Sequence, residues 1–373
     1  MSSELVLAKI NKIYQRRGKE PVHAVRDLSL TVKPGEITAL LGSSGCGKTS
    51  TLRMIAGFEE TTGGAITLDG IPIHGRPPAR RNVAMAFEAY SLYPPLTIGE
   101  NIAFALKSGR LSAAERTKRV GQIAEMLEIA NIVDRYPSSV SGGEQQRASL
   151  GRALVRPAGL YLLDEPMGQL EPQLRSILRG RIKHFLREHA CTTILVTHDQ
   201  TEANAIADRI AVMEEGVLQQ YATPAELKER PANVFVGTFI GEPPMNVFPA
   251  KLRNADGRFD FVIDGNAVLS YMGNEFPAAL ARLGERNSIT LGARPHALRI
   301  ADSGLKGKVV SCQWLGDQTH LAVEIAGRLA VSVAHERINV RAGADITFAI
   351  DSADLHIFDS VDGRALVHGG AAS

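Results

Sequence analysis

The stretch "GSSGCGKT", residues 42–49, decides how this 373-residue chain is interpreted. It fits the pattern G-x-x-x-x-G-K-[ST], in which a glycine-rich loop turns its backbone N–H groups toward a phosphate. The apolar run "EITALLG" precedes it, and the helical pattern "TSTLRMIAG" follows it. A strand, a glycine-rich turn and a helix N-terminus in this order form an anion site, so the sequence predicts nucleotide binding.

The residue types in this stretch match that chemistry. Glycines permit the backbone dihedrals that a tight phosphate loop needs. Lys48 would bring positive charge to the outer phosphates, and Thr49 would offer its hydroxyl to Mg²⁺. The alternative is a chance match, which the flanking strand and helix make less common. The predicted nucleotide-binding residues here are Gly42, Ser43, Ser44, Gly45, Cys46, Gly47, Lys48, Thr49 and Ser50.

Strand-like and helical patterns alternate up to about residue 235. Ser112 and Glu115 fit a capping box at the start of one helical pattern. The alternation predicts an α/β domain over residues 1–235 with a largely parallel central sheet, and a helical subdomain over about 88–155. The apolar runs that read as buried strands are "EITALLG", "NVAMAF", "GLYLLDE", "TTILVTHD" and "RIAVMEEG".

A second domain is predicted over residues 236–373. Proline recurs in "ERPANVFVGTFIGEPPMNVF", and long helical patterns largely stop there. Short apolar runs separated by Gly, Asn and Asp follow, including "SITLGARP" and "HLAVEIAG". This pattern indicates a β-rich domain, which we expect to be a small barrel.

Composition excludes several classes of protein. The formal net charge of +2 is too small to indicate nucleic-acid binding. The three cysteines, Cys46, Cys191 and Cys312, show no metal-binding spacing and favour a reducing compartment. No apolar run approaches the ~20 residues of a membrane helix, so we expect the chain not to cross a membrane by itself.

Two further motifs carry phosphate chemistry. In "LYLLDEP", residues 160–166, Asp164 stands at a strand end, where it would hold Mg²⁺, and Glu165 would polarise a water molecule. A strand that ends in an ordinary acidic turn is the alternative. In "VSGGEQQRASLGRAL", Ser141, Gly142 and Gly143 open a helix and would form a second anion site. A simple helix cap is the alternative there.

The order of these motifs, followed by "VTHD", resembles the ATPase subunit of an ABC transporter over about the first 235 residues. The resemblance implies a head-to-tail pair of ATPase domains. The phosphate loop of one domain and Ser141, Gly142 and Gly143 of the other would enclose one ATP. It also implies that Tyr14 stacks on adenine and that His198 senses the γ-phosphate.

The second domain looks like the regulatory extension of carbohydrate-importer ATPases of the maltose-transporter type, which implies an oligonucleotide/oligosaccharide-binding (OB) fold. "FIGEPPMNVFPAKL", "LGARPHAL" and "GKVVSCQWLGDQTHLAVEIAG" carry this resemblance. In "LGARPHAL", His296 stands where that family usually has glutamate. Iron, polyamine and sulfate importers carry related extensions, and a soluble ABC ATPase acting on nucleic acid or a degenerate regulatory subunit is a further alternative.

Glu88, in "FEAYSLYPPLTIGEN", occupies the position of a glutamine that in the family contacts Mg²⁺ and the attacking water. We therefore count Glu88 with Thr49 and Asp164 as a predicted metal ligand. Glu171 likewise replaces an aspartate that reaches across the dimer. These departures favour pairing with a second, different ATPase subunit, and neutral variation in a homodimer is the alternative.

The sequence thus predicts the ATP-hydrolysing subunit of an ABC importer for a sugar, polyol, glycerol or glycerol phosphate. Its expected cofactors are ATP and Mg²⁺, with Glu165 and His198 as catalytic residues. Its expected partners are two transmembrane permease subunits, an extracytoplasmic solute-binding protein that acts indirectly, and a second ATPase subunit, and no nucleic acid is expected. It would lie peripherally on the cytoplasmic face of the bacterial inner membrane.

Overall fold

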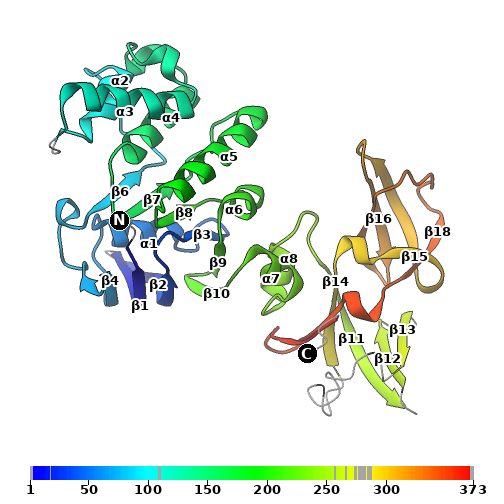
Figure 1. Ribbon diagram of the computed structural model, residues 1–373. Coiled ribbons are helices and arrows are strands. Elements are labelled where there is room, and N and C mark those ends of the chain that lie inside the picture. The colour runs from blue at the N-terminus through cyan, green and yellow to red at the C-terminus, as the bar shows by residue number, and fades with distance from the viewer. Residues whose placement is uncertain are drawn as a thin grey trace. The chain divides into compact units, whose positions relative to one another are not determined.

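The computed structural model describes residues 3–16, 18–107, 111–255, 258–264, 267–272, 275, 283 and 288–369. The chain divides into two compact units, Met1–Pro224 and Ala225–Ser373. Figure 1 labels the helices and strands of both units. The predicted boundary lay after residue 235, whereas the compact units separate after Pro224, so helix α8 (Val234–Phe239) belongs to the second unit.

The first unit contains a six-stranded sheet with the order β10-β9-β3-β8-β7-β6. All of its pairings are parallel except that of β9 with β10. The predicted largely parallel sheet is confirmed. Its inner strands β3, β7 and β8 are mainly apolar and buried along their whole length because both faces are covered. The strands are β3 (Ile37–Gly42), β6 (Val83–Ala86), β7 (Leu160–Asp164), β8 (Thr193–Val196), β9 (Arg209–Glu214) and β10 (Val217–Ala222).

A second, antiparallel sheet of the first unit was not predicted. Its order is β2-β1-β4-β5, with β1 (Leu5–Arg16), β2 (Lys19–Val32), β4 (Gly63–Leu68) and β5 (Ile71–Pro72). Helix α1 (Lys48–Ala56) shares one buried core with both sheets, which includes Leu7, Leu52 and Leu162. This core fixes the start of α1, and therefore the glycine-rich loop, against the central sheet.

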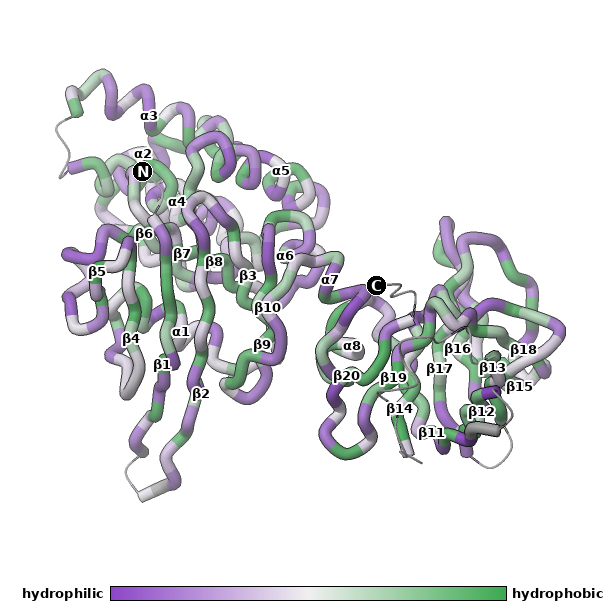
Figure 2. The backbone as a smooth tube through the Cα atoms, turned by 60° about the horizontal axis from the view of Figure 1, so that its bottom comes forward, coloured by the Kyte–Doolittle hydropathy of each residue, from purple (hydrophilic) through white to green (hydrophobic). Residues whose placement is uncertain are grey.

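The remaining helices of the first unit are α2 (Ile98–Phe104), α3 (Ala113–Met126), α4 (Gly142–Leu154), α5 (Pro172–Glu188) and α6 (Gln200–Ile206). Helices α2, α3 and α4 gather at one end of the unit (Figure 1). The predicted capping box is confirmed, since Ser112 Oγ accepts from the backbone N–H of Glu115 and the Glu115 carboxylate accepts from the Ser112 N–H. Helices α3 and α5 alternate polar and apolar residues along their length, as Figure 2 shows, so each buries one face.

The second unit is β-rich, as predicted, and its strands form two antiparallel sheets where the sequence predicted one small barrel. The first sheet has the order β13-β12-β11-β14-β19-β20, and the second has the order β17-β16-β15-β18. The strands are β11 (Asn246–Ala255), β12 (Arg258–Ile263), β13 (Ala267–Met272), β14 (Ser288–Ala293), β15 (Arg299–Trp314), β16 (Thr319–Ile325), β17 (Arg328–Ala334), β18 (Asp345–Ala349), β19 (Leu355–Asp359) and β20 (Ala365–His368).

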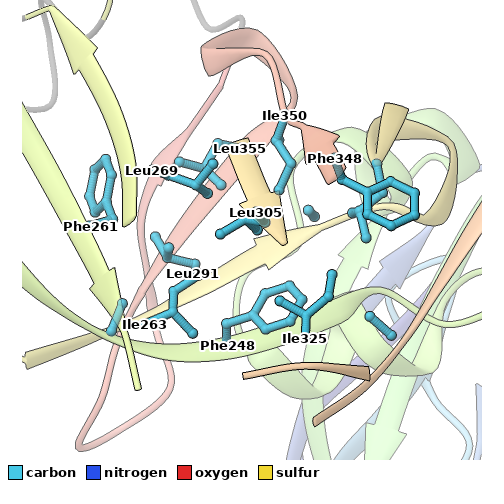
Figure 3. Packing of buried hydrophobic residues seen from close by; sticks show 14 of the residues in the cluster. Phe248, Phe261, Ile263, Leu269, Leu291, Leu305, Ile325, Phe348, Ile350 and Leu355 are labelled. Carbon is cyan, nitrogen blue, oxygen red and sulfur yellow. The ribbon is translucent and has the colours of Figure 1, made fainter. Parts of the chain in front are cut away.

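Both sheets of the second unit contribute to one hydrophobic core. Phe248, Phe261 and Leu291 from the first sheet lie in the same cluster as Leu305 and Phe348 from the second (Figure 3). Alternation of buried and exposed residues along β12 and β16 turns one face of each sheet toward this core.

Further short helices among the described residues are α7 (Pro224–Glu229) and the 3₁₀ turns η1 (Pro78–Arg80), η2 (Ala130–Ile132), η3 (Pro137–Ser139), η5 (Pro295–Ala297) and η6 (Ser352–Asp354).

Among the described residues, no helix combines the length and the apolar character that a membrane span requires.

Candidate nucleotide site

The loop between β3 and α1 depends on glycine. Gly45 has φ +78° and Gly47 has φ +101°, in the left-handed region where side chains are strained. A Cβ atom on Gly47 would also clash with the carbonyl oxygen of Ala24, on strand β2. Gly45 faces open space instead, with no atom within 4 Å of a Cβ built there. The first glycine therefore lets the loop approach a ligand, and the second lets it pack on the strand beneath.

Lys48 is the first residue of α1 and is only 8% exposed. Its Nζ donates hydrogen bonds to the carbonyl oxygens of Gly42, at 2.8 Å, and Ser43, at 2.9 Å. The helix begins after a glycine, which has no side-chain oxygen to cap the first N–H groups. Positive charge and backbone donors therefore collect at one point, which suits a polyphosphate.

Two carboxylates follow strand β7. Asp164, its last residue, is 4% exposed, and its Oδ1 has no hydrogen-bond partner. Burial, followed by the negative charges of Glu88 and Glu165, raises the pKa of Asp164 to about 6. Glu165 has φ +45°, and its carboxylate lies 3.0 Å from Nδ1 of His198. A desolvated carboxylate without a partner is the kind of group that a divalent cation satisfies.

One cavity of about 380 Å³ brings most of the predicted residues together. Because the carboxyl ends of parallel strands meet at one edge of a sheet, the segments after β3, β6, β7 and β8 converge there. Ala24 is the one lining residue that sequence reasoning missed, and its own segment carries no motif that would mark it. The lining residues are Ala24, Ser44, Gly45, Gly47, Lys48, Thr49, Ser50, Glu88, Glu165 and His198.

Other predicted residues lie around this cavity rather than in its lining. Gly42 and Cys46 lie beneath the loop, where the Cys46 sulfur is 3.7 Å from Lys48 Nζ. The Ser43 carbonyl also accepts from Lys48. Tyr14, on β1, hydrogen-bonds Ser50 Oγ at 3.0 Å and donates to the Glu59 carboxylate, so it is attached to the helix that follows the loop.

The predicted second anion site stands apart from the cavity within one chain. Ser141 is the N-cap of α4, and its hydroxyl donates to the carboxylate of Glu144 at 2.7 Å. Gly142 and Gly143 form the first turn, and neither lines the cavity that Lys48 lines. Glu171 caps the start of α5 without a side-chain hydrogen bond to the helix. The two anion sites therefore do not meet within a single copy.

The residues present fit Mg²⁺ only in company with a phosphate. Among the described residues, no group of three or more His, Cys, Asp or Glu side chains is arranged to hold a metal ion. Mg²⁺ normally takes one or two carboxylates, with phosphate oxygens and water completing six ligands. Asp164 and the Thr49 hydroxyl match that mode, and the unpartnered Oδ1 of Asp164 supports it.

A glycine-rich loop at a helix N-terminus, a buried aspartate at the end of β7 and a Glu–His pair on the cavity of that loop define a P-loop ATPase. Residues 25–168 match the ABC transporter family, and residues 291–358 match the TOBE domain. A solved dimer of the ATP-binding cassette MJ0796, bound to ADP and Pi, is 27% identical with a TM-score of 0.55, covering 59% of this chain and 98% of that one.

Curated relatives match along nearly the whole chain. The trehalose/maltose import ATP-binding protein MalK of Thermococcus litoralis is 41% identical over 92% of this chain and 96% of its own length. The sn-glycerol-3-phosphate import ATP-binding protein UgpC of Cereibacter sphaeroides is 39% identical over 98% of this chain and 100% of its own length. The chain therefore belongs to the ABC transporter family, as an ATP-binding subunit.

Proposed function

We propose that the protein hydrolyses ATP to drive import of a sugar, a polyol, glycerol or glycerol phosphate through membrane permease subunits. Whole-length similarity to ATP-binding subunits named for trehalose/maltose and sn-glycerol-3-phosphate import supports this solute class. The protein would act peripherally at the cytoplasmic face of the bacterial inner membrane. Residues about 88–155 would serve as the helical subdomain and residues 236–373 as a regulatory domain.

The observation that carries the proposal is the Glu165–His198 pair, which opens on the same cavity as Lys48 and Thr49. Glu165 would orient and deprotonate the attacking water, and His198 would hold its carboxylate in place. Lys48 and the N–H groups of α1 would stabilise the negative charge that builds on the transferred phosphoryl group. Mg²⁺, held by Thr49 and Asp164, would neutralise charge on the phosphates when bound.

Two more predicted contacts belong to this proposal. Tyr14, held by Ser50, would stack on the adenine. Glu88 lines the same cavity. It would place a carboxylate beside the metal, at the position where the resemblance implies the neutral amide of a glutamine. Charge favours the metal and opposes the phosphate, so Glu88 would tighten the requirement for Mg²⁺ before ATP binds well.

The proposed dimer follows from the separation of the two anion sites. Because Ser141 and the two glycines after it do not line the cavity of their own chain, a second ATPase subunit would bring its own helix start to the phosphates. That subunit is another copy of this chain or a different ATPase. The departures at Glu88 and Glu171 lead us to propose the different one.

Replacing Glu165 with glutamine tests the chemistry. The glutamine keeps the size of the side chain and removes its capacity as a base, so we expect ATP hydrolysis to fall by about 100-fold or more. Nucleotide binding, followed by the rise in melting temperature with Mg-ATP, should be retained. The exposed Glu60, replaced by glutamine, is the matched control. A Glu165→Gln variant as fast as the unmodified chain would refute the assignment.

Co-purification of the tagged chain from its native membrane tests the assembly. Permease subunits together with a second, different ATPase would support import and mixed pairing. Permease subunits with two copies of this chain would support import and contradict mixed pairing. Recovery without any membrane subunit, in detergent that preserves related complexes, would contradict the importer itself.

A further inference from the structure

A separate small cavity lies within the second unit, among α7, η5 and the segment from η6 to β19. Its volume is about 130 Å³, which is the space of about four water molecules. That is well below the ~300 Å³ at which pockets for drug-sized ligands begin. Its lining residues are Lys228, Glu229, Arg294, His296, Ala297, Ala353, Asp354, His356 and Gly369.

Arg294 is the buried charge of this cavity. It is 5% exposed, and its guanidinium donates to the carbonyl oxygens of Gly237 at 2.8 Å, Lys228 at 2.8 Å, and Ile240. Its Nε–H is buried and has no partner. Within the described part of the chain, no carboxylate forms an ion pair with Arg294. A buried cation with only neutral partners is costly, and an anion in the cavity would remove that cost.

The other lining groups add to the positive character. Lys228 is exposed and, among the described residues, forms no ion pair. Burial of the ring and the charges of Lys228 and Arg294 lower the pKa of His296, against the opposing charge of Asp354. The Asp354 carboxylate is already engaged by Arg299 at 2.9 Å. The one remaining acid in the lining, Glu229, is exposed to solvent.

The uncharged side chain of His356 forms one side of the cavity. Its Nδ1 lies 3.1 Å from Nδ1 of His368, and its side chain is 6% exposed. Burial, together with the smaller effects of the charges of His368 and Arg294, lowers its pKa to about 3, so the ring is uncharged near neutral pH. The cavity therefore combines two cations, Arg294 and Lys228, with the uncharged imidazole of His356.

We propose that this cavity binds a small oxyanion, either a free ion such as phosphate or the phosphate group of a small metabolite. Arg294 supplies the buried donor, and Lys228 and His296 contact the anion from the rim. A glutamate at position 296 would place a negative charge at the mouth of the cavity and repel an anion. The imidazole of His296 carries no such charge and can donate a hydrogen bond to an anion.

Binding of inorganic phosphate to the full-length chain, measured by isothermal titration calorimetry at constant ionic strength, tests the proposal. The Lys48→Ala background removes phosphate binding at the nucleotide loop and keeps the result independent of the proposed ATPase function. We expect one site per chain, and a loss of affinity of at least tenfold in His296→Glu. Exposed His335, on the same unit, replaced by glutamate, is the matched control and should bind phosphate as before.

Binding of three further ligands, sulfate, glycerol phosphate and acetate, identifies the source of the anion. If sulfate binds as tightly as phosphate, the cavity is a site for free ions. If glycerol phosphate binds more tightly than phosphate, the cavity is a site for a phosphorylated metabolite. Acetate, which has the charge but not the tetrahedral shape, should bind weakly. Absence of phosphate binding in the Lys48→Ala background, or equal binding by the His296→Glu and His335→Glu variants, would overturn the proposal.

Discussion

Replacing Asp164 with asparagine should make the ligand-free protein more stable while removing its response to Mg²⁺. The carboxylate is 4% exposed, and its Oδ1 has no hydrogen-bond partner. Burial, followed by the charges of Glu88 and Glu165, raises its pKa from 3.8 to about 6. An ionised group in that environment opposes folding until a cation arrives.

The magnitude follows from the pKa shift. A shift of about two units, at about 1.4 kcal/mol each, corresponds to ~3 kcal/mol lost from the free energy of unfolding above pH 6. Because the pKa is raised, the folded state binds the proton more tightly, so the loss is absent below pH 4 and complete above pH 6. The asparagine amide leaves its own buried donor unpaired, at about 1 kcal/mol. The net expected gain near pH 7.5 is about 2 kcal/mol.

Thermal unfolding without nucleotide or metal measures this gain. For a unit of this size, 1 kcal/mol moves the melting temperature by about 2–4 °C, so the variant should melt ~4–8 °C higher at pH 7.5. The difference should disappear near pH 4.5, where the remaining charge penalty of about 1 kcal/mol is balanced by the cost of the unpaired amide. Exposed Asp134, replaced by asparagine, is the control and should change little at either pH.

Two outcomes would refute this reasoning. If the Asp164→Asn variant melts at or below the wild-type temperature at pH 7.5, the carboxylate is solvated or paired in solution. If it melts higher by the same amount at pH 4.5, the gain arises from packing rather than from charge. In either case the carboxylate would not be the unsatisfied group that we place at the metal.

Two further changes have defined outcomes. Gly47→Ala puts a side chain at φ +101° against a backbone carbonyl, so it should cost about 1–3 kcal/mol of stability and abolish the rise in melting temperature with Mg-ATP. Gly121→Ala, on α3 with open space around it, should be neutral or stabilising, and an equal loss in both variants would contradict the steric argument. Glu59→Gln should loosen Tyr14 and weaken ATP binding several-fold without changing the affinity for inorganic triphosphate, measured by calorimetry. The exposed neighbour Glu60, replaced by glutamine, is its control, and equal weakening for both ligands would show that Glu59 supports the loop rather than the base-stacking residue.

Features that are set by residues close together in the chain were predictable from the sequence. Gly47 and Lys48 belong to one contiguous loop, whose spacing specifies the turn and the helix start together. Ser141 and Glu144 form a capping box three residues apart, so the start of α4 also follows from local order. Asp164 was identified because an apolar run ended at it, and a parallel sheet brings such ends to one edge.

Contacts between distant segments were decided only by tertiary packing. The Ala24 carbonyl beneath Gly47 depends on how β2 lies against α1, and no local pattern in β2 marks it. The burial of the Arg294 guanidinium, whose Nε has no partner, depends on three carbonyls at α7 and at α8 with its C-cap. The Glu165–His198 pair combines both kinds of information. Each residue was predicted from the sequence, and the adjacency of β7 and β8 set the 3.0 Å separation of their side chains. Backbone dihedral preferences depend on neighbouring residues and therefore follow from the sequence. The burial that removes water from a charged group depends on the whole folded chain.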